Sequence, residues 1–106
     1  MDFQFNTDSS VMGTENVAER IEAQLRNKLG RLEERLTRLE VHVSDGNASK
    51  GGGDDKSCTI EVRPRGGNPV SVTAKSGDVD AAARDAGSKM VSLLESHFGK
   101  ADRNAR

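Results

Sequence analysis

The stretch KLGRLEERLTRLEVHVSD, residues 28–45, contains the point where the hydrophobic period of the chain changes. In its first part, apolar residues recur at steps of three and four, as on one face of an amphipathic helix. From Leu39 onward the period is two, with Leu39, Val41 and Val43 on one side, as in a half-buried strand. Gly30 weakens the last helical turn by about 1 kcal/mol relative to Ala. The stretch therefore predicts a helix followed closely by a strand.

Upstream of this stretch, the helical stripe extends toward the N-terminus. Its apolar members are Val17, Ile21, Leu25, Leu29, Leu32 and Leu36. Thr14 is the expected N-cap, because a hydroxyl there can accept a hydrogen bond from a free backbone N–H. Before it, Asp2–Asn6 (DFQFN) alternates polar and apolar residues, which predicts a first strand.

Downstream of this stretch, two further alternating segments follow a Gly-rich loop. Residues 45–55 (DGNASKGGGDD) carry four Gly and predict a flexible loop. Residues 57–63 and 70–75 alternate with period two, and a Pro-Arg-Gly-Gly-Asn turn separates them. Three consecutive alternating strands predict an antiparallel meander with one face in water.

The last pattern is helical and begins after Asp78, an N-cap or first-turn acid. Gly99 is the expected helix stop, followed by a frayed tail. The resulting class is α+β, in the order β-α-β-β-β-α, with a four-stranded sheet covered on one face by two helices. We expect a single domain over residues 1–99, with a flexible loop at 45–55 and a disordered tail at 100–106.

Composition limits the classes of function. Among 106 residues, 16 Lys and Arg oppose 17 Asp and Glu, which gives a net charge of −1. No apolar run has the roughly 18 residues of a membrane span, and the N-terminus does not resemble a signal peptide. Trp and Tyr are absent, so the usual stacking platforms for single-stranded nucleic acid are missing. On net charge alone, nucleic acid is an unexpected partner. The single Cys cannot form an intramolecular disulfide and suits a reducing compartment, so we expect a cytoplasmic protein.

The charges of the first helix nevertheless separate when they are placed on a helical wheel at about 100° per residue. One flank of the apolar stripe carries the bases Arg20, Lys28, Arg31 and Arg35. The other carries the acids Glu15, Glu19, Glu22 and Glu33, with Arg26 as the one base among them. A solvated surface would explain charged flanks, but solubility alone favours interspersed signs. The third and fourth strands and their turn carry Lys56, Arg63, Arg65 and Lys75 against Glu61, a local charge of 4 − 1 = +3.

Catalytic and metal-binding candidates have weaker support. Cys58 lies on the apolar side of its strand, where burial would leave the thiol inert. His42 and His97 are isolated and lack metal-ligand spacing. Asp54 and Asp55 fall in the Gly-rich loop, which lacks the rigid positioning that acid–base catalysis demands. The sequence therefore predicts neither an enzyme nor a cofactor, although a small hydrolase using Cys58 or the carboxylates stays an alternative.

Several strings together resemble the ribosome hibernation promoting factors and ribosome-associated inhibitors, formerly called sigma-54 modulation proteins. The resemblance runs from Phe3 to about Phe98, and its clearest parts are Lys28–Asp45, Gly52–Arg63 (GGDDKSCTIEVR) and Pro69–Met90 (PVSVTAKSGDVDAAARDAGSKM). It implies a fold like that of a double-stranded RNA-binding domain. It also implies binding to small-subunit rRNA near the decoding region, which blocks access of mRNA and tRNA. The implied partner is the small ribosomal subunit, with no membrane and no small-molecule substrate.

The same resemblance assigns candidate site residues. Lys28 and Arg31 match basic family positions on the first helix, Arg38 matches one at the second strand, and Lys89 matches one on the last helix. We expect these four to hold rRNA phosphates, with Arg20, Arg35 and the strand bases as outer contacts. Lys28 and Arg31 also belong to the basic flank found from the helical wheel.

The chain also departs from the family pattern. Asp80 stands where relatives usually have Tyr, and Ser92, Leu93 and Ser96 stand where they carry bases or Gln. The last helix is therefore net acidic, which should weaken an RNA interface that depends on phosphate contacts. The alternative is a non-enzymatic protein-interaction module that has lost or weakened its RNA site. The sequence ends where long family members continue into a dimerising domain, so we expect the short form, a monomer.

Overall fold

The computed structural model describes residues 1–7, 16–45 and 56–104. Its elements follow the order strand, helix, three strands, helix that the sequence predicts, with a short 3-10 helix after the first α-helix. Their bounds are β1 Asp2–Thr7, α1 Val17–Leu29, η1 Gly30–Arg35, β2 Leu36–Asp45, β3 Lys56–Pro64, β4 Val70–Ser76 and α2 Val79–Asn104. Thr14 and residues 46–55, for which a cap and a loop were expected, lie outside the described residues.

The strands form one four-stranded sheet in the order β1-β2-β3-β4. β2, β3 and β4 pair antiparallel, which confirms the predicted meander. β1 pairs parallel to β2, with Phe3 opposite Leu39. Parallel neighbours need a long crossover connection, and the α1 segment supplies it. The β2–β3 register places Val41 against Ile60 on the core side. Because successive side chains of a strand point to opposite faces, the polar residues next to Val41 and Ile60 point to the other face of the sheet.

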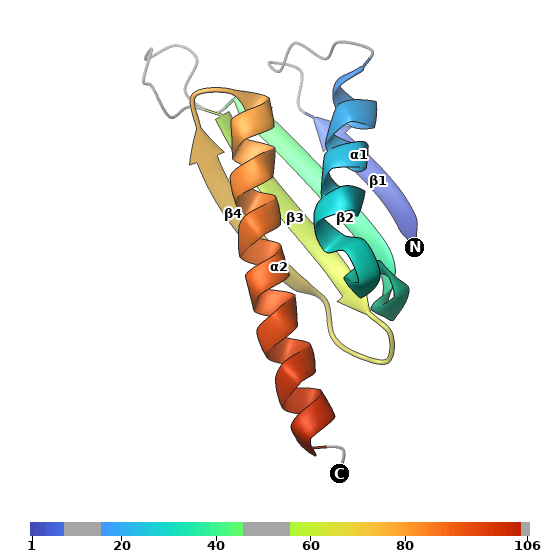
Figure 1. The fold of residues 1–106 in the computed structure, drawn as a ribbon. Helices are drawn as coiled ribbons and strands as arrows, with labels where there is room; N and C mark the ends of the chain where they lie inside the picture. The colour runs from blue at the N-terminus through green and yellow to red at the C-terminus, as the bar shows by residue number, and fades with distance from the viewer. Residues whose placement is uncertain (8–15, 46–55, 105–106) are drawn as a thin grey trace.

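Both helices cover the same face of the sheet, and the opposite face is open (Figure 1). The core between them is built from the predicted apolar positions. Ile21 and Leu25 of α1, Ile60 of β3, and Met90 and Leu94 of α2 are all at most 2% exposed. Burial of a large aliphatic side chain contributes about 1.5–3 kcal/mol. Within the described residues no polar or charged residue is buried, so this core is wholly apolar.

The boundary between the first helix and the second strand differs from the prediction. α1 ends at Leu29, and Gly30 adopts a positive φ of 52° that favours glycine. A 3-10 helix follows, and Leu36 already begins β2 instead of continuing the helical stripe. The helical wheel is therefore valid only to Leu29. The spacing of Leu32 and Leu36 fits the helical stripe, but α1 ends before Gly30 and the chain enters β2 at Leu36.

α2 starts as predicted and ends later than predicted. The Asp78 carboxylate accepts a hydrogen bond from the Ala81 backbone N–H at 2.8 Å, which is the geometry of an N-cap. Gly99 does not stop the helix, which continues to Asn104, so most of the expected tail is helical. A glycine ends a helix when it takes the left-handed conformation, and Gly99 has no positive φ.

Two absences concern the described part of the chain. None of its helices is both long and apolar enough to cross a membrane. Its His, Cys, Asp and Glu side chains form no group of three or more that could hold a metal ion.

Cys58 is fully buried in the core, and this burial raises the pKa of its thiol to about 12.

Candidate nucleic-acid interface

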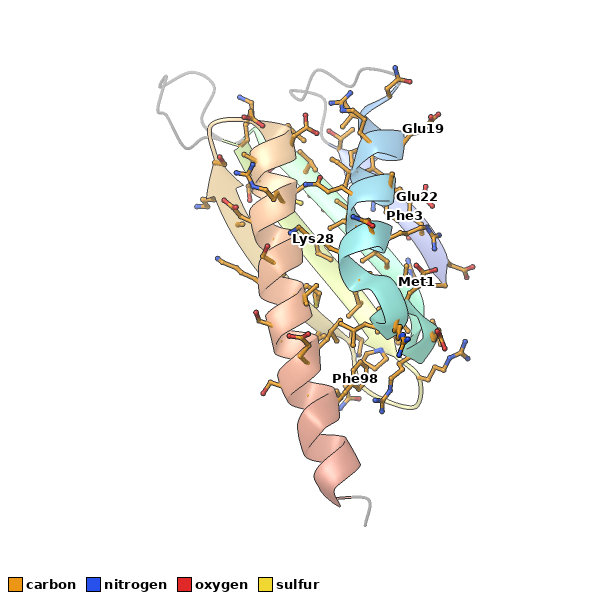
Figure 2. The ribbon with its side chains drawn as sticks, viewed as in Figure 1. Met1, Phe3, Glu19, Glu22, Lys28 and Phe98 are labelled. Carbon is orange, nitrogen blue, oxygen red and sulfur yellow. The ribbon has the colours of Figure 1, made fainter. Side chains whose placement is uncertain are left out.

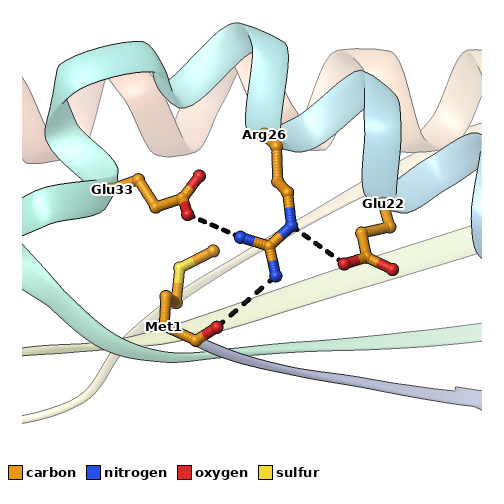
Figure 3. Close-up of polar contacts among 4 residues, drawn as sticks. All are labelled: Met1, Glu22, Arg26 and Glu33. Atoms are coloured by element: carbon orange, nitrogen blue, oxygen red, sulfur yellow. Dashed lines mark hydrogen bonds and ion pairs between the residues drawn. The ribbon is translucent and has the colours of Figure 1, made fainter.

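Two acids of the acidic flank of α1, Glu22 and Glu33, share one base, Arg26, on the β1 side of the molecule. Its guanidinium donates to Glu22 at 2.8 Å and to Glu33 at 2.5 Å (Figure 3). A third, longer hydrogen bond of 3.4 Å reaches the backbone carbonyl of Met1. The hydrogen bond to Glu22 raises the pKa of Arg26. This cluster ties α1 and η1 to the start of β1, which gives Glu22 and Glu33 a structural role.

The basic flank of α1 faces α2. Arg20 pairs with Asp80 at 3.2 Å, and the Lys28 ammonium donates to the Ser88 hydroxyl at 3.1 Å. Figure 2 shows Lys28 between the two helices. Both α1 side chains thus lie along the line where the helices meet, which we call the α1–α2 contact line, defined by Arg20, Lys28, Asp80 and Ser88.

Close packing at Gly87 positions Lys28. A Cβ atom at Gly87 would lie 2.8 Å from Leu25 Cδ2 and 3.0 Å from Lys28 Cδ. An added Cβ would therefore force the Leu25 or Lys28 side chain to shift from its position against α2. The stem covers apolar surface while the ammonium stays at the edge, as expected for long basic side chains. The sequence showed Gly87 as one more small residue in an Ala-rich helix and gave no signal of this contact.

Arg31 and Arg35 lie in η1, beyond the part of the chain to which the helical wheel applies. Arg31 is exposed and makes no hydrogen bond or ion pair with the described residues. The Arg35 guanidinium stacks over the ring of Phe98, 4.0 Å from its centroid. Such cation–π contacts contribute about 0.5–2 kcal/mol. Arg31 thus extends the basic end of α1, whereas Arg35 is held against the later turns of α2.

Lys89 and Arg38 lie elsewhere. The Lys89 ammonium donates to the backbone carbonyl of Thr73 in β4 at 2.9 Å, so its side chain points to β4 and away from α1. Arg38 lies on the open face of the sheet, where its guanidinium donates to Gln4 and, at 3.3 Å, to Glu40. The six predicted residues therefore do not form one patch. Arg20 and Lys28 lie together with Arg31 close by, and the other three are distributed over α2, η1 and the open face.

The structure adds one residue to the predicted set, Asp80. The sequence identified it only as a departure from the family pattern. Its carboxylate forms an ion pair with Arg20, which is the first base along the α1–α2 contact line from the N-terminus of α1. Both side chains are about half exposed, at 50% and 54%, so the pair contributes little to stability, about 0–1 kcal/mol. Its main consequence is electrostatic, because it cancels one of the positive charges that would face a phosphate.

Among the described residues, several bases are exposed, and Cys58 is the one buried ionisable group. A family model for the sigma 54 modulation protein / S30EA ribosomal protein matches residues 13–102. The chain belongs to this family. The family predicted from the sequence, that of the hibernation promoting factors, is thereby confirmed. No curated protein sequence matches the chain.

Two solved structures share the fold of this chain. The chain is similar to the Protein Y N-terminal domain of Thermus thermophilus, with 19% identity and a TM-score of 0.70. The match covers 92% of this chain and 99% of that one. It is also similar to a ribosomal subunit interface protein from Coxiella burnetii, with 14% identity, a TM-score of 0.75, and 93% and 99% of the two chains covered. These likenesses confirm the predicted β-α-β-β-β-α architecture.

Proposed function

We propose that this protein is a cytoplasmic ribosome-binding hibernation factor. It binds small-subunit rRNA near the decoding region and lowers translation by blocking access of mRNA and tRNA. Membership of the S30EA ribosomal protein family over residues 13–102 supports ribosome binding. The observation that supports an RNA site at α1 is the direction of its basic flank, since Arg20 and Lys28 face α2 while Arg26 pairs with Glu22 and Glu33 on the other side.

The proposed mechanism is steric and electrostatic. Lys28 and Arg31 bind rRNA phosphates with Arg20 beside them, and Lys89 and Arg38 are separate contacts on the β4 side and on the open face of the sheet. Phosphate contacts fix position and orientation without reading sequence. This suits a chain that has only three Phe, no Tyr and no Trp, since it binds a folded RNA surface through shape and charge instead of stacking on splayed bases. No bond is made or broken, so the protein is not an enzyme.

The test is co-sedimentation with purified small subunits across a salt series. Lys28→Met keeps the aliphatic stem against Gly87 and removes the charge, and Arg31→Gln removes a charge from an exposed residue that has no partner among the described residues. The double variant should reduce the slope of log affinity against log salt concentration by about two, roughly one unit per phosphate contact. Arg84→Gln, at an exposed base of α2 outside the predicted set, is the one-charge control and should leave the slope unchanged.

A second candidate, a non-enzymatic protein-interaction module of the same fold, is favoured by one observation. Asp80 neutralises Arg20, and α2 also exposes Asp85 and Glu95. Such a module would keep its partner after loss of Lys28 and Arg31. Wild-type protein that does not travel with small subunits even at low salt would exclude the RNA-binding proposal and leave this one.

A further inference from the structure

β1 forms one edge of the sheet, and among the described residues no strand lies on its outer side. A free edge presents unpaired backbone N–H and C=O groups, which can pair with another chain. Arg26 binds the carbonyl of Met1, just before the strand. The described side chains make no hydrogen bond to the backbone of Phe3–Asn6, and the strand DFQFNT contains no Lys, Arg or Pro, the residues that often protect an edge. The β1 edge is therefore open to strand pairing.

The other edge of the sheet, β4, is protected. The Lys89 ammonium donates to the Thr73 carbonyl at 2.9 Å, which occupies a backbone acceptor of this strand. Lys75 adds an exposed charge to the strand, and charged side chains oppose pairing at an edge. Figure 1 shows α2 running along β3 and β4. The two edges of the same sheet therefore differ, and only the β1 edge combines a free backbone with uncharged neighbours at Phe3–Asn6.

Apolar side chains line the helix side of the β1 edge. Phe3 and Phe5 are half-buried, whereas their partners in β2, Leu39 and Val41, are at most 1% exposed. Part of each phenylalanine side chain therefore stays accessible where the core reaches the edge of the sheet. A further strand beside β1 would cover this surface, and each Å² of apolar area removed from water contributes about 25 cal/mol.

Carboxylates of α1 lie on the same side as these phenylalanines. Figure 2 shows Glu19 and Glu22 on the flank of α1 that is directed toward Phe3. Glu22 and Glu33 share Arg26, and Glu19 is exposed and has no partner within the described residues. The side-chain charge of this flank over the described residues is therefore 1 − 3 = −2.

These features indicate an extended basic peptide as the partner. In an added strand, Lys or Arg at alternate positions would lie on the helix side, where the stems cover Phe3 and Phe5 and the charged ends meet Glu19. The open face adds no preference, because Asp2 lies opposite Arg38. A second copy of β1 has no base to offer and would bring a second set of α1 carboxylates. RNA phosphates would be repelled by the same carboxylates.

We propose that the β1 edge binds an extended basic segment of a partner protein, which adds to the four-stranded sheet as a further strand. We call Phe3, Phe5, Glu19 and Glu22, with the outer backbone of β1, the β1 edge site. It contains none of the bases proposed to bind rRNA. Either site can therefore be lost without the other.

The experiment is an NMR titration of the isotope-labelled full chain with the acetylated and amidated peptide Lys-Thr-Lys-Thr-Lys-Thr, as long as the six residues of β1. Thr favours strands, and alternation places all Lys side chains on one side. Amide resonances of Asp2–Thr7 should shift and those of Val70–Ser76 should not. The peptide Glu-Thr-Glu-Thr-Glu-Thr has the same length and the opposite charge and should not bind.

Two variants test the charge requirement. Glu19→Lys should weaken binding of the Lys-Thr peptide about fivefold, because it replaces an attraction between exposed charges with a repulsion. Glu95→Lys makes the same change of charge at an exposed acid of α2 and is the matched control, so it should leave the affinity unchanged. Both positions are exposed and make no contact that the substitution would break within the described structure, and far-UV circular dichroism confirms that each variant is folded.

Each outcome decides for or against the β1 edge site. Shifts at β1 that Glu19→Lys alone weakens support it. Wild-type protein that does not bind the Lys-Thr peptide at millimolar concentration overturns it, as do shifts confined to other elements or equal binding of the Glu-Thr peptide. Equal losses in Glu19→Lys and Glu95→Lys would mean that net charge alone attracts the peptide. Dimers of the free protein with β1 at their interface would assign the edge to a second copy. Binding to small subunits is measured separately, and its failure would overturn the RNA proposal alone.

Discussion

At the scale of single residues, burial determines what Cys58 can do. Its thiol is fully buried in the core, and the lack of polar surroundings raises its pKa from 9.0 to about 12. A difference of 12 − 9 = 3 units corresponds to about a thousandfold less thiolate at a given pH near neutrality. The structure therefore argues against the hydrolase that the sequence left as an alternative.

We predict that a thiol-reactive reagent does not label Cys58 in the native protein at pH 8 and labels it rapidly in urea. The measurement is the labelling rate by mass spectrometry, with free cysteine as the reference. Labelling of the native protein at a rate near that of free cysteine would contradict the buried, inert thiol and would reopen the hydrolase alternative.

The same raised pKa predicts a pH dependence of stability. The folded state holds the Cys58 proton more tightly than the unfolded state does, so its contribution is complete below about pH 9 and is lost as the pH rises toward about 12. The free energy of unfolding should fall with pH across this window. The comparison is urea denaturation of the wild type and Cys58→Ala. The difference between their slopes against pH isolates the thiol, and equal slopes would contradict the prediction.

At the scale of elements, two glycines of α2 have opposite roles. Gly87 lies against Leu25 and Lys28, where an added Cβ would meet side-chain atoms at 2.8 and 3.0 Å. A Cβ at Gly99 would meet nothing within 4 Å. One glycine is therefore required by helix–helix packing, and the other only weakens the helix.

We predict that Gly87→Ala destabilises the protein and that Gly99→Ala, its matched control, stabilises it. Overpacking at Gly87 costs about 1–3 kcal/mol, which exceeds the gain of up to about 1 kcal/mol in helix propensity. At Gly99 only the gain of about 0.5–1 kcal/mol applies. Urea denaturation followed by circular dichroism measures both. A Gly87→Ala variant as stable as Gly99→Ala would show that α1 and α2 separate easily.

The elements also show how far the sequence could predict this molecule. Periodicity identified every strand and both long helices, because burial on one side leaves a regular apolar pattern in each. It failed at Leu36 and at Gly99, since local spacing does not reveal where a glycine takes a positive φ. For the site, the helical wheel placed Arg20 and Lys28 on one flank correctly. It could not place Arg35, Lys89 or Arg38, because their positions depend on tertiary contacts with Phe98, Thr73 and Gln4.

At the scale of the whole molecule, the net charge of −1 first argued against an RNA partner. The structure shows that the distribution of the charge is more informative than its sum. Arg26 pairs with Glu22 and Glu33 on the β1 side, whereas Arg20 and Lys28 face α2. Asp80 is the exception, since it places an acid against the first base of the α1–α2 contact line.

We predict that Asp80→Asn strengthens binding to small subunits and that Glu19→Gln does not. Each substitution removes one negative charge from an exposed residue and brings the net charge from −1 to 0, so their effects on the whole molecule are equal. Only Asp80→Asn frees the Arg20 guanidinium, which now pairs with Asp80 at 3.2 Å. One additional phosphate contact should steepen the salt slope by about one and raise the affinity severalfold at low salt. Equal gains for both variants would mean that net charge governs binding, whereas no gain for either would mean that Arg20 does not contact the RNA.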